Sequence, residues 1–137
     1  MSDENRELLQ RAYDAFGRGD IPGVLETFDD DIEWNAPKVL PHGMSVRGRE
    51  AVGGFFQTIA DVWGTSLALQ LDSIVAEGDR AFATGTASGS IDGVRGTYRW
   101  VHAWTIAGGR CIRFDEYVDP SPEVIAASSR VRAGAGA

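Results

Sequence analysis

Tight-turn signals divide the second half of the chain into short extended segments, and no other feature of the sequence limits the fold so strongly. Asp92-Gly93 is a dipeptide typical of two-residue hairpin turns, and Ala107-Gly108-Gly109 marks a further turn. EGD at 77–79 indicates a third. The segments between these turns alternate in polarity or are rich in β-branched, aromatic and small residues. The sequence therefore predicts an antiparallel meander with strands at 67–71, 80–91, 96–106 and 110–118.

The first half of the chain has helical spacing instead. Apolar residues predict a first helix over about 4–16 and a third over about 48–63. Between them, Asp20-Ile21-Pro22 is typical of the start of a short helix, with Asp as cap and Pro in the first turn. A brief strand around 32–34 leads into a loop at 35–47. We expect an α+β fold with a strongly curved, cone-shaped, mixed or antiparallel sheet. Three N-terminal helices would pack over its concave face and enclose a pocket.

Length and composition suit a single domain. The chain has 137 residues, 43% of them hydrophobic and 24% charged, so we expect one domain over 1–127 and a disordered Ala/Gly tail over 128–137. The net charge of −7 repels phosphate backbones and anionic lipid, so we expect no nucleic acid or membrane partner. Because Cys111 is the one cysteine, no internal disulfide is possible, and no apolar segment follows the N-terminus. We therefore expect a cytoplasmic protein.

The last predicted strand, 110–118, turns a carboxylate toward the core. Side chains alternate along a strand, so one face is formed by Ile112, Phe114, Glu116 and Val118. This apolar face must be the inner one, whereas Cys111 falls on the other, mostly solvent-compatible face. A buried carboxylate needs a partner or has a raised pKa, and general acid–base chemistry uses such a shift. Glu116 is therefore either a proton-transferring residue or half of an internal ion pair with an arginine such as Arg99.

The neighbouring strand, 96–106, divides into an aromatic face and a mixed face. The aromatic face consists of Tyr98, Trp100, His102, Trp104 and Ile106. It suits either the wall of a pocket for a flat apolar ligand or the outer face of the sheet. We favour the outer face, with most of it buried in a homodimer. His102 is either structural or, because its intrinsic pKa is near neutral, a proton carrier.

The order of these elements resembles the nuclear transport factor 2-like superfamily, in particular its SnoaL-like and ketosteroid-isomerase-like branch. Three stretches carry the resemblance: LLQRAYDAFGRGDIPGVLETFDDDIEW (8–34), VRGREAVGGFF (46–56) and GGRCIRFDEYVD (108–119). The resemblance implies the cone fold. For function it implies only a range, because this fold hosts isomerases, cyclases, epoxide hydrolases, dehydratases and non-catalytic binders.

Carried over residue by residue, the resemblance selects Glu116 again. Polyketide cyclases of the SnoaL type place an acid at the corresponding point of the last strand. The base of the isomerases falls at Ala36, and their tyrosine falls near Ala12, so Tyr13 is expected to point elsewhere. The Arg-x-Asp pair of the epoxide hydrolases has no counterpart around 84–86. The resemblance thus favours neither steroid isomerisation nor the epoxide hydrolase mechanism.

Three functions are compatible with this sequence. We favour cofactor-independent proton transfer on a small apolar molecule, with Glu116 carrying the proton and His102 or Arg99 stabilising negative charge. The alternatives are a non-catalytic homodimeric ligand-binding domain and a protein-interaction module. No nucleotide loop, nucleophile elbow or metal-ligand spacing is present, so we expect neither cofactor nor metal. His42 is interpreted as a solvated loop residue, with the pocket mouth as the alternative. The expected pocket wall consists of Trp34, Phe56, Trp63, Val101, Phe114 and Val118.

Overall fold

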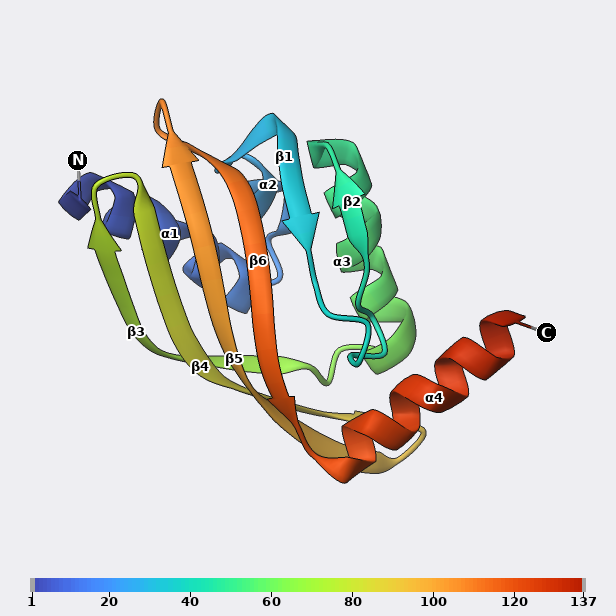
Figure 1. Cartoon of the computed structure of the whole chain (residues 1–137). Helices are drawn as coiled ribbons and strands as arrows, with labels where there is room; N and C mark the ends of the chain where they lie inside the picture. The colour runs from blue at the N-terminus through green and yellow to red at the C-terminus, as the bar shows by residue number, and fades with distance from the viewer. Residues whose placement is uncertain (1, 137) are drawn as a thin grey trace.

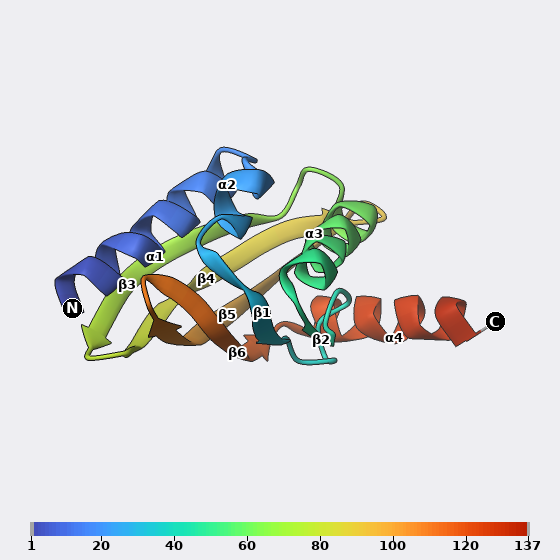
Figure 2. The same ribbon diagram turned by 90° about the horizontal axis from the view of Figure 1, so that it is seen from above.

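A curved six-stranded sheet organises the protein, whose computed structural model describes residues 2–136 (Figure 1). The helices are α1 (Ser2–Gly17), α2 (Ile21–Leu25), α3 (Arg49–Trp63) and α4 (Pro122–Gly136). The strands are β1 (Phe28–Asn35), β2 (Ser45–Arg47), β3 (Ala68–Glu77), β4 (Arg80–Ile91), β5 (Val94–Ala107) and β6 (Arg110–Pro120). Helices α1, α2 and α3 lie over the concave side, and α4 continues beyond one end of the sheet (Figure 2).

The strand order confirms the predicted α+β cone. The sheet runs β2-β1-β6-β5-β4-β3, with β1 and β6 parallel and the other neighbours antiparallel. The predicted meander is present as β3 to β6. Two-residue turns join these consecutive strands, and a connection that short only allows antiparallel pairing of neighbours. Three strands extend what the sequence indicated: β1 is longer than 32–34, β3 is longer than 67–71, and β2 lies within the predicted loop.

Two of the three predicted turns have positive φ at both central residues, the backbone of a tight hairpin. Asp92 and Gly93 have φ angles of 52° and 80°, and Gly108 and Gly109 have φ angles of 59° and 76°. Positive φ at both central residues matches the right-handed twist of the flanking strands, and Asp-Gly and Gly-Gly tolerate it best. These turns fix the register between β4 and β5 and between β5 and β6.

A bulge in β6 overturns the expected side for Cys111. The pairing with β5 shifts between Thr105 and Ile106, whose partners are Arg113 and Cys111, so Ile112 is an extra residue. One inserted residue exchanges the two faces of the strand on its N-terminal side. Cys111 is therefore fully buried, and Ile112 is only half-buried. From Phe114 onward the predicted alternation holds.

Strand β4 carries small residues where other parts of the molecule come close. A Cβ at Gly89 would lie 2.7 Å from the Trp63 ring of α3, and one at Gly85 would overlap the Trp100 ring. At both positions only the hydrogen atom of a glycine fits. The two glycines of β4 thus allow aromatic rings from α3 and β5 to lie directly against its backbone.

Helix α4 occupies the segment for which disorder was predicted. Val124 and Ala127 are buried in one cluster with Trp63, and Ser128 donates a hydrogen bond to the Lys38 carbonyl (3.1 Å). Helical spacing of these buried positions and the high helix propensity of alanine outweigh the glycines that suggested disorder. The domain boundary expected at 127 therefore falls inside a helix, and residue 137 lies outside the described residues.

Candidate active site

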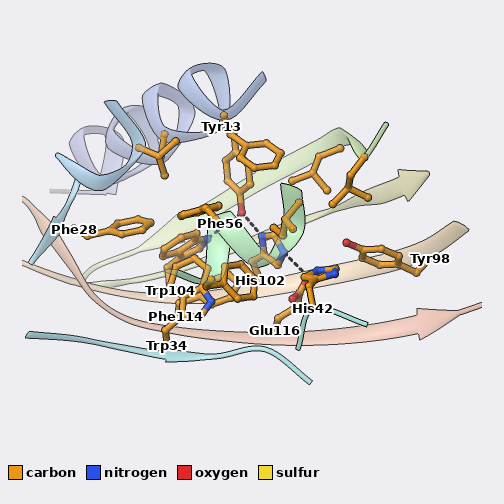
Figure 3. Close-up of a pocket in the computed structure, with 17 residues that line it drawn as sticks. Tyr13, Phe28, Trp34, His42, Phe56, Tyr98, His102, Trp104, Phe114 and Glu116 are labelled. Carbon is orange, nitrogen blue, oxygen red and sulfur yellow. Dashed lines mark hydrogen bonds and ion pairs between the residues drawn. The ribbon is translucent and has the colours of Figure 1, made fainter. Parts of the chain in front are cut away.

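A cavity of about 60 Å³ lies between the concave side of the sheet and helices α1 and α3 (Figure 3). Most of its wall is apolar and aromatic, including Phe28, Trp34, Phe55, Phe56, Trp104 and Phe114. Polar atoms come from five further side chains: Tyr13, His42, Tyr98, His102 and Glu116. A small-molecule site typically combines an apolar hollow with a few converging polar groups.

A chain of hydrogen bonds crosses one side of this cavity. Trp104 Nε1 donates to the Tyr13 hydroxyl oxygen over 3.0 Å. The same hydroxyl lies 2.6 Å from Nδ1 of His102. On the other side of the imidazole, Nε2 lies 2.9 Å from Oε2 of Glu116. Both the histidine and the carboxylate are almost fully buried, with side-chain exposures of 7% and 5%.

The ends of this chain determine which nitrogen of His102 carries the proton. A carboxylate at Glu116 can only accept, so Nε2 of His102 is the donor to it. Nδ1 of the neutral imidazole therefore accepts from the Tyr13 hydroxyl, whose oxygen in turn accepts from Trp104. Burial raises the pKa of Tyr13 well above its usual value, so the hydroxyl keeps its proton. The carboxylate is thus the acceptor end of the chain.

Strand pairing holds His102 and Glu116 together. They are directly opposite each other on β5 and β6, and the Trp100 ring stacks on the imidazole with 4.0 Å between ring centroids. Only one carboxylate oxygen is used: no residue in the range 2–136 hydrogen-bonds to Oε1 of Glu116. An oriented carboxylate with one free oxygen in an apolar cavity has the geometry of a general base.

His42 is the second imidazole of the cavity. Its Nδ1 accepts a hydrogen bond from Trp63 Nε1 over 3.0 Å, and the residue is 2% exposed. Burial lowers its pKa to about 4, although the nearby charge of Glu116 acts in the opposite direction. His42 is therefore neutral at pH 7, with its proton on Nε2. Within residues 2–136, no acceptor pairs with that Nε2–H group.

We expect His42 to make the protein less stable in acid. The folded protein holds this imidazole neutral with a pKa of about 4, whereas the unfolded chain takes up the proton near 6.5. The stabilising contribution is complete above pH 6.5 and is lost as the pH falls toward 4, by up to about 3 kcal/mol. Urea unfolding of the wild type and of His42→Gln at pH 7 and pH 4.5 measures it. The stability difference between the two proteins should shrink at pH 4.5, and an unchanged difference would contradict the assignment.

Two more polar groups of the cavity wall lack a protein partner. Trp34 Nε1 is buried without a hydrogen bond among the described residues. The Tyr98 hydroxyl likewise receives or donates none within that part of the chain, and burial raises its pKa well above the usual value. Buried polar groups are nearly always paired, so an unpaired set around one cavity indicates a site that water or a ligand completes.

An open hollow of about 660 Å³ between α1 and β3 adjoins the cavity. The two share four lining side chains: Tyr13, Phe16, Leu67 and Leu69. Phe16, Leu67 and Leu69 are only half-buried, so this is the weakest part of the wall. The cavity itself is less than half of the about 150 Å³ that holds a benzene molecule. A ring-sized ligand therefore fits only when side chains of this wall move.

The structure brings together most, but not all, of the residues that the sequence selected. Glu116 and His102 are in contact, and the cavity wall includes the predicted Trp34, Phe56 and Phe114. Trp63 is buried behind the wall, where it donates to His42 instead of facing the cavity.

Arg99, Val101 and Val118 lie away from the cavity and are corrections. Arg99 is on the outer face of the sheet, where it pairs with Asp119 at 3.2 Å, and its side chain is 77% exposed. Val101 borders a separate outer hollow. Val118 keeps the inner parity but packs against the buried cluster that contains Trp63 and Trp100, beyond the cavity wall. Arg99 and Val101 have the opposite parity to His102, which turns them outward. The partner of Glu116 is therefore a histidine, not an arginine.

The aromatic face of β5 was assigned to the wrong side of the sheet. Tyr98, Trp100 and Trp104 are each at most 3% exposed within the single chain, and they face the helices. Their burial needs no second copy. Alternation along a strand separates its side chains into two faces. It does not show which of the two faces lies on the concave side of the sheet.

Two site residues were misplaced by sequence reasoning. Tyr13 was expected to point elsewhere on its helix, yet it lies over His102; its place in the apolar stripe of α1 was the available signal. His42 was interpreted as solvated, and only its neighbours Pro41 and Gly43 indicated an ordered loop. The loop can close tightly because position 43 is glycine: an added Cβ there would overlap the Pro37 carbonyl.

Metal binding and membrane crossing are two further possibilities for residues 2–136. Among these residues, no three His, Cys, Asp or Glu side chains are placed to hold a metal ion. None of the helices in this part of the chain is both long and apolar enough to cross a membrane.

Comparisons with known proteins agree with this architecture. The profile of the SnoaL-like domain matches residues 9–114, so the chain belongs to the SnoaL-like family, within the NTF2-like fold. An NTF2-like protein of unknown function from Burkholderia pseudomallei is 26% identical, with a TM-score of 0.79 over 96% of this chain and 97% of that one. No curated protein matches the chain significantly.

Two further solved structures are similar. TerC, co-crystallized with polyporic acid, is 26% identical, with a TM-score of 0.78 over 94% of this chain and 98% of its own. An LEH-like epoxide hydrolase from M. tuberculosis is 15% identical, with a TM-score of 0.73 over 96% of this chain and 94% of that one. At that identity the second likeness shows the fold alone.

Proposed function

We propose that the protein binds a small, largely apolar molecule in its cavity and moves a proton on it, without a cofactor, using Glu116 as the base. The observation that carries this proposal is the buried carboxylate of Glu116, held by His102 at one oxygen and unpaired at the other. His102 and Tyr13 act as positioning residues that fix the carboxylate through the hydrogen-bond chain. The reaction class is that of isomerases, cyclases and dehydratases, which begin by breaking a C–H bond.

The proton transfer has a simple course. Oε1 of Glu116 takes a proton from a carbon next to a carbonyl group, and the electron pair of the C–H bond forms an enolate. The Nε2–H of His102 donates to Oε2 throughout and keeps the other oxygen aimed at the ligand. Return of the proton to a different atom completes an isomerisation. If the proton on Glu116 is first replaced by one from solvent, protonation of the same carbon completes an exchange, and in D₂O this converts C–H to C–D. No oxidant or second substrate is needed.

The apolar wall supports this assignment. Few water molecules compete in a cavity of about 60 Å³ that is lined mainly by aromatic rings, and interactions with charge are stronger there than in water. The co-crystallization of polyporic acid with TerC, a relative of similar fold, favours a small organic ligand here as well.

Deuterium exchange tests the proposal without knowledge of the natural substrate. Cyclopentanone has acidic protons next to its carbonyl, and proton NMR in D₂O follows their loss. We expect the wild-type protein to accelerate this exchange above the rate in matched buffer. Binding of cyclopentanone without accelerated exchange would instead favour the non-catalytic ligand-binding domain, and an absence of both would overturn the small-molecule proposal.

A homodimer through the sheet and a cytoplasmic location stay predictions. The outer face, rather than the aromatic inner one, now supports the dimer. Adjacent strands β3 to β6 expose four apolar side chains on it: Val75, Phe82, Val101 and Tyr117. Such a patch is of the kind that a second copy covers.

A further inference from the structure

We propose that His42 and Tyr98 form the oxygen-binding end of the cavity, so that the ligand is a small carbonyl compound. Its oxygen would accept from Nε2 of His42, and its neighbouring C–H group would face Glu116. This inference rests on the proposed function and supplies what the hydrogen-bond chain lacks, a donor for the oxygen on which negative charge develops. His102 cannot fill that role because both of its nitrogens are already used.

Trp63 fixes His42 as a donor toward the cavity. Its indole N–H occupies Nδ1 of His42, so the remaining ring proton is on Nε2. Packing limits rotation of the imidazole: ring centroids lie 5.6 Å from Phe55 and 6.0 Å from Trp63. The histidine is thus pre-oriented before any ligand arrives, which is the condition for a donor to favour a transition state over a ground state.

The loop that carries His42 is held at both ends. The Ala36 N–H donates to the Met44 carbonyl over 2.9 Å, which closes the base of the loop. From the other side, Ser128 and Arg132 of α4 donate to the Lys38 carbonyl. Helix α4 therefore supports a cavity residue that lies far from it in the sequence.

The neutral state of His42 suits it to stabilise an enolate beside a carboxylate base. A protonated imidazole in the same cavity would stabilise the ionised Glu116 carboxylate and make it a weaker base. Burial instead keeps His42 neutral, with its pKa lowered to about 4, so the carboxylate stays available. A neutral N–H group still donates to an oxygen as it becomes negative.

Tyr98 lies at the same end of the cavity. Its ring centroid is 6.3 Å from that of His42, and its hydroxyl end points toward the His42 ring (Figure 3). His42, Tyr98 and Glu116 all line the same cavity. Burial and, to a smaller extent, the charge of Glu116 raise the pKa of Tyr98, so its hydroxyl keeps its proton. With no partner in residues 2–136, the hydroxyl is free to donate to the same oxygen.

Two isosteric probes isolate the oxygen contact. Cyclopentanone and methylenecyclopentane have the same ring and differ in one group, which is C=O in the ketone and C=CH₂ in the alkene. Titration of the protein with each probe, followed by the NMR signals of the backbone amides, gives the two Kd values. We expect the wild type to bind the ketone about 3- to 10-fold more tightly than the alkene, the range of one neutral hydrogen bond.

Two substitutions at His42 form a matched pair. In His42→Asn the side-chain oxygen still accepts from Trp63, but the cavity has no donor at this position. His42→Gln places an amide N–H near the position of Nε2. We expect His42→Asn to abolish the ketone preference while keeping the affinity for the alkene, and to slow α-proton exchange about 10²-fold. His42→Gln should restore part of both.

The outcomes separate this inference from the proposed function. If both probes bind equally well to the wild type and to His42→Asn while exchange still requires Glu116, the oxygen site is refuted and proton transfer stands. If neither probe binds and no exchange is accelerated, the proposed function fails and the inference fails with it. A ketone preference that disappears in His42→Asn and partly returns in His42→Gln supports the inference.

Discussion

Replacing Glu116 with Gln is expected to slow the α-proton exchange of cyclopentanone by a factor of about 10²–10⁴, the usual contribution of one general base. Glutamine keeps the size of the side chain, and its carbonyl oxygen can still accept from Nε2 of His102. It has no basic oxygen to receive a proton. The Kd for cyclopentanone should change little, because the basicity of Oε1 matters only while the proton is being transferred. Exchange rates from NMR, compared at equal saturation, provide the measurement.

Asp115→Asn is the matched control for this experiment. Asp115 is the adjacent residue of β6, but its carboxylate points to the other face, where it accepts hydrogen bonds from Asn35 and Arg113. We expect exchange close to the wild-type rate. An equal decrease in both variants would attribute the effect to disturbance of the strand, and undiminished exchange in Glu116→Gln would place the base elsewhere.

The sequence was sufficient to place Glu116 on the inner face because alternation is regular in the part of β6 that carries it. The bulge lies at Ile112, upstream of Phe114, so it misplaces Cys111 and leaves Glu116 correctly turned inward. The glycine turns fixed the hairpin order for a similarly local reason, since Asp-Gly and Gly-Gly tolerate the positive φ angles that two-residue hairpin turns require. Local chemistry of this kind can be read from a single sequence.

Contacts between distant segments could not be predicted in the same way. Tyr13 and His102 are 89 positions apart, and His42 meets its partner Trp63 across a loop and a helix. These contacts depend on how α1 and the loop pack on the sheet. The spacing of apolar residues in the sequence does not determine that packing. The choice between a concave and a convex aromatic face is also a property of the whole sheet. The hydrogen-bond chain, and with it the most specific part of the candidate site, therefore emerges only in three dimensions.

Replacing Trp104 with Ala is expected to lower the free energy of unfolding by about 3–5 kcal/mol, as for other large aromatic residues in a core. The Trp104 ring is 3% exposed, with ring centroids 4.7 Å from Phe114 and 5.7 Å from Phe28. Its removal also takes the N–H donor from Tyr13. Urea unfolding followed by circular dichroism measures the decrease.

The same variant decides between the two placements of the aromatic face. If that face were an outer, homodimeric surface, Trp104→Ala would release monomers and its cost would depend on protein concentration. With the ring inside the cone, the decrease in stability should be the same at all concentrations, and sedimentation should show an unchanged assembly state.

Tyr117→Ala on the outer face, where the ring is 64% exposed, provides the contrast: its effect on unfolding should stay within about 0.5 kcal/mol, and any change should be seen in assembly. A dissociated Trp104→Ala variant of wild-type stability would return the aromatic face to the outside of the sheet and remove the cavity on which the proposed function depends.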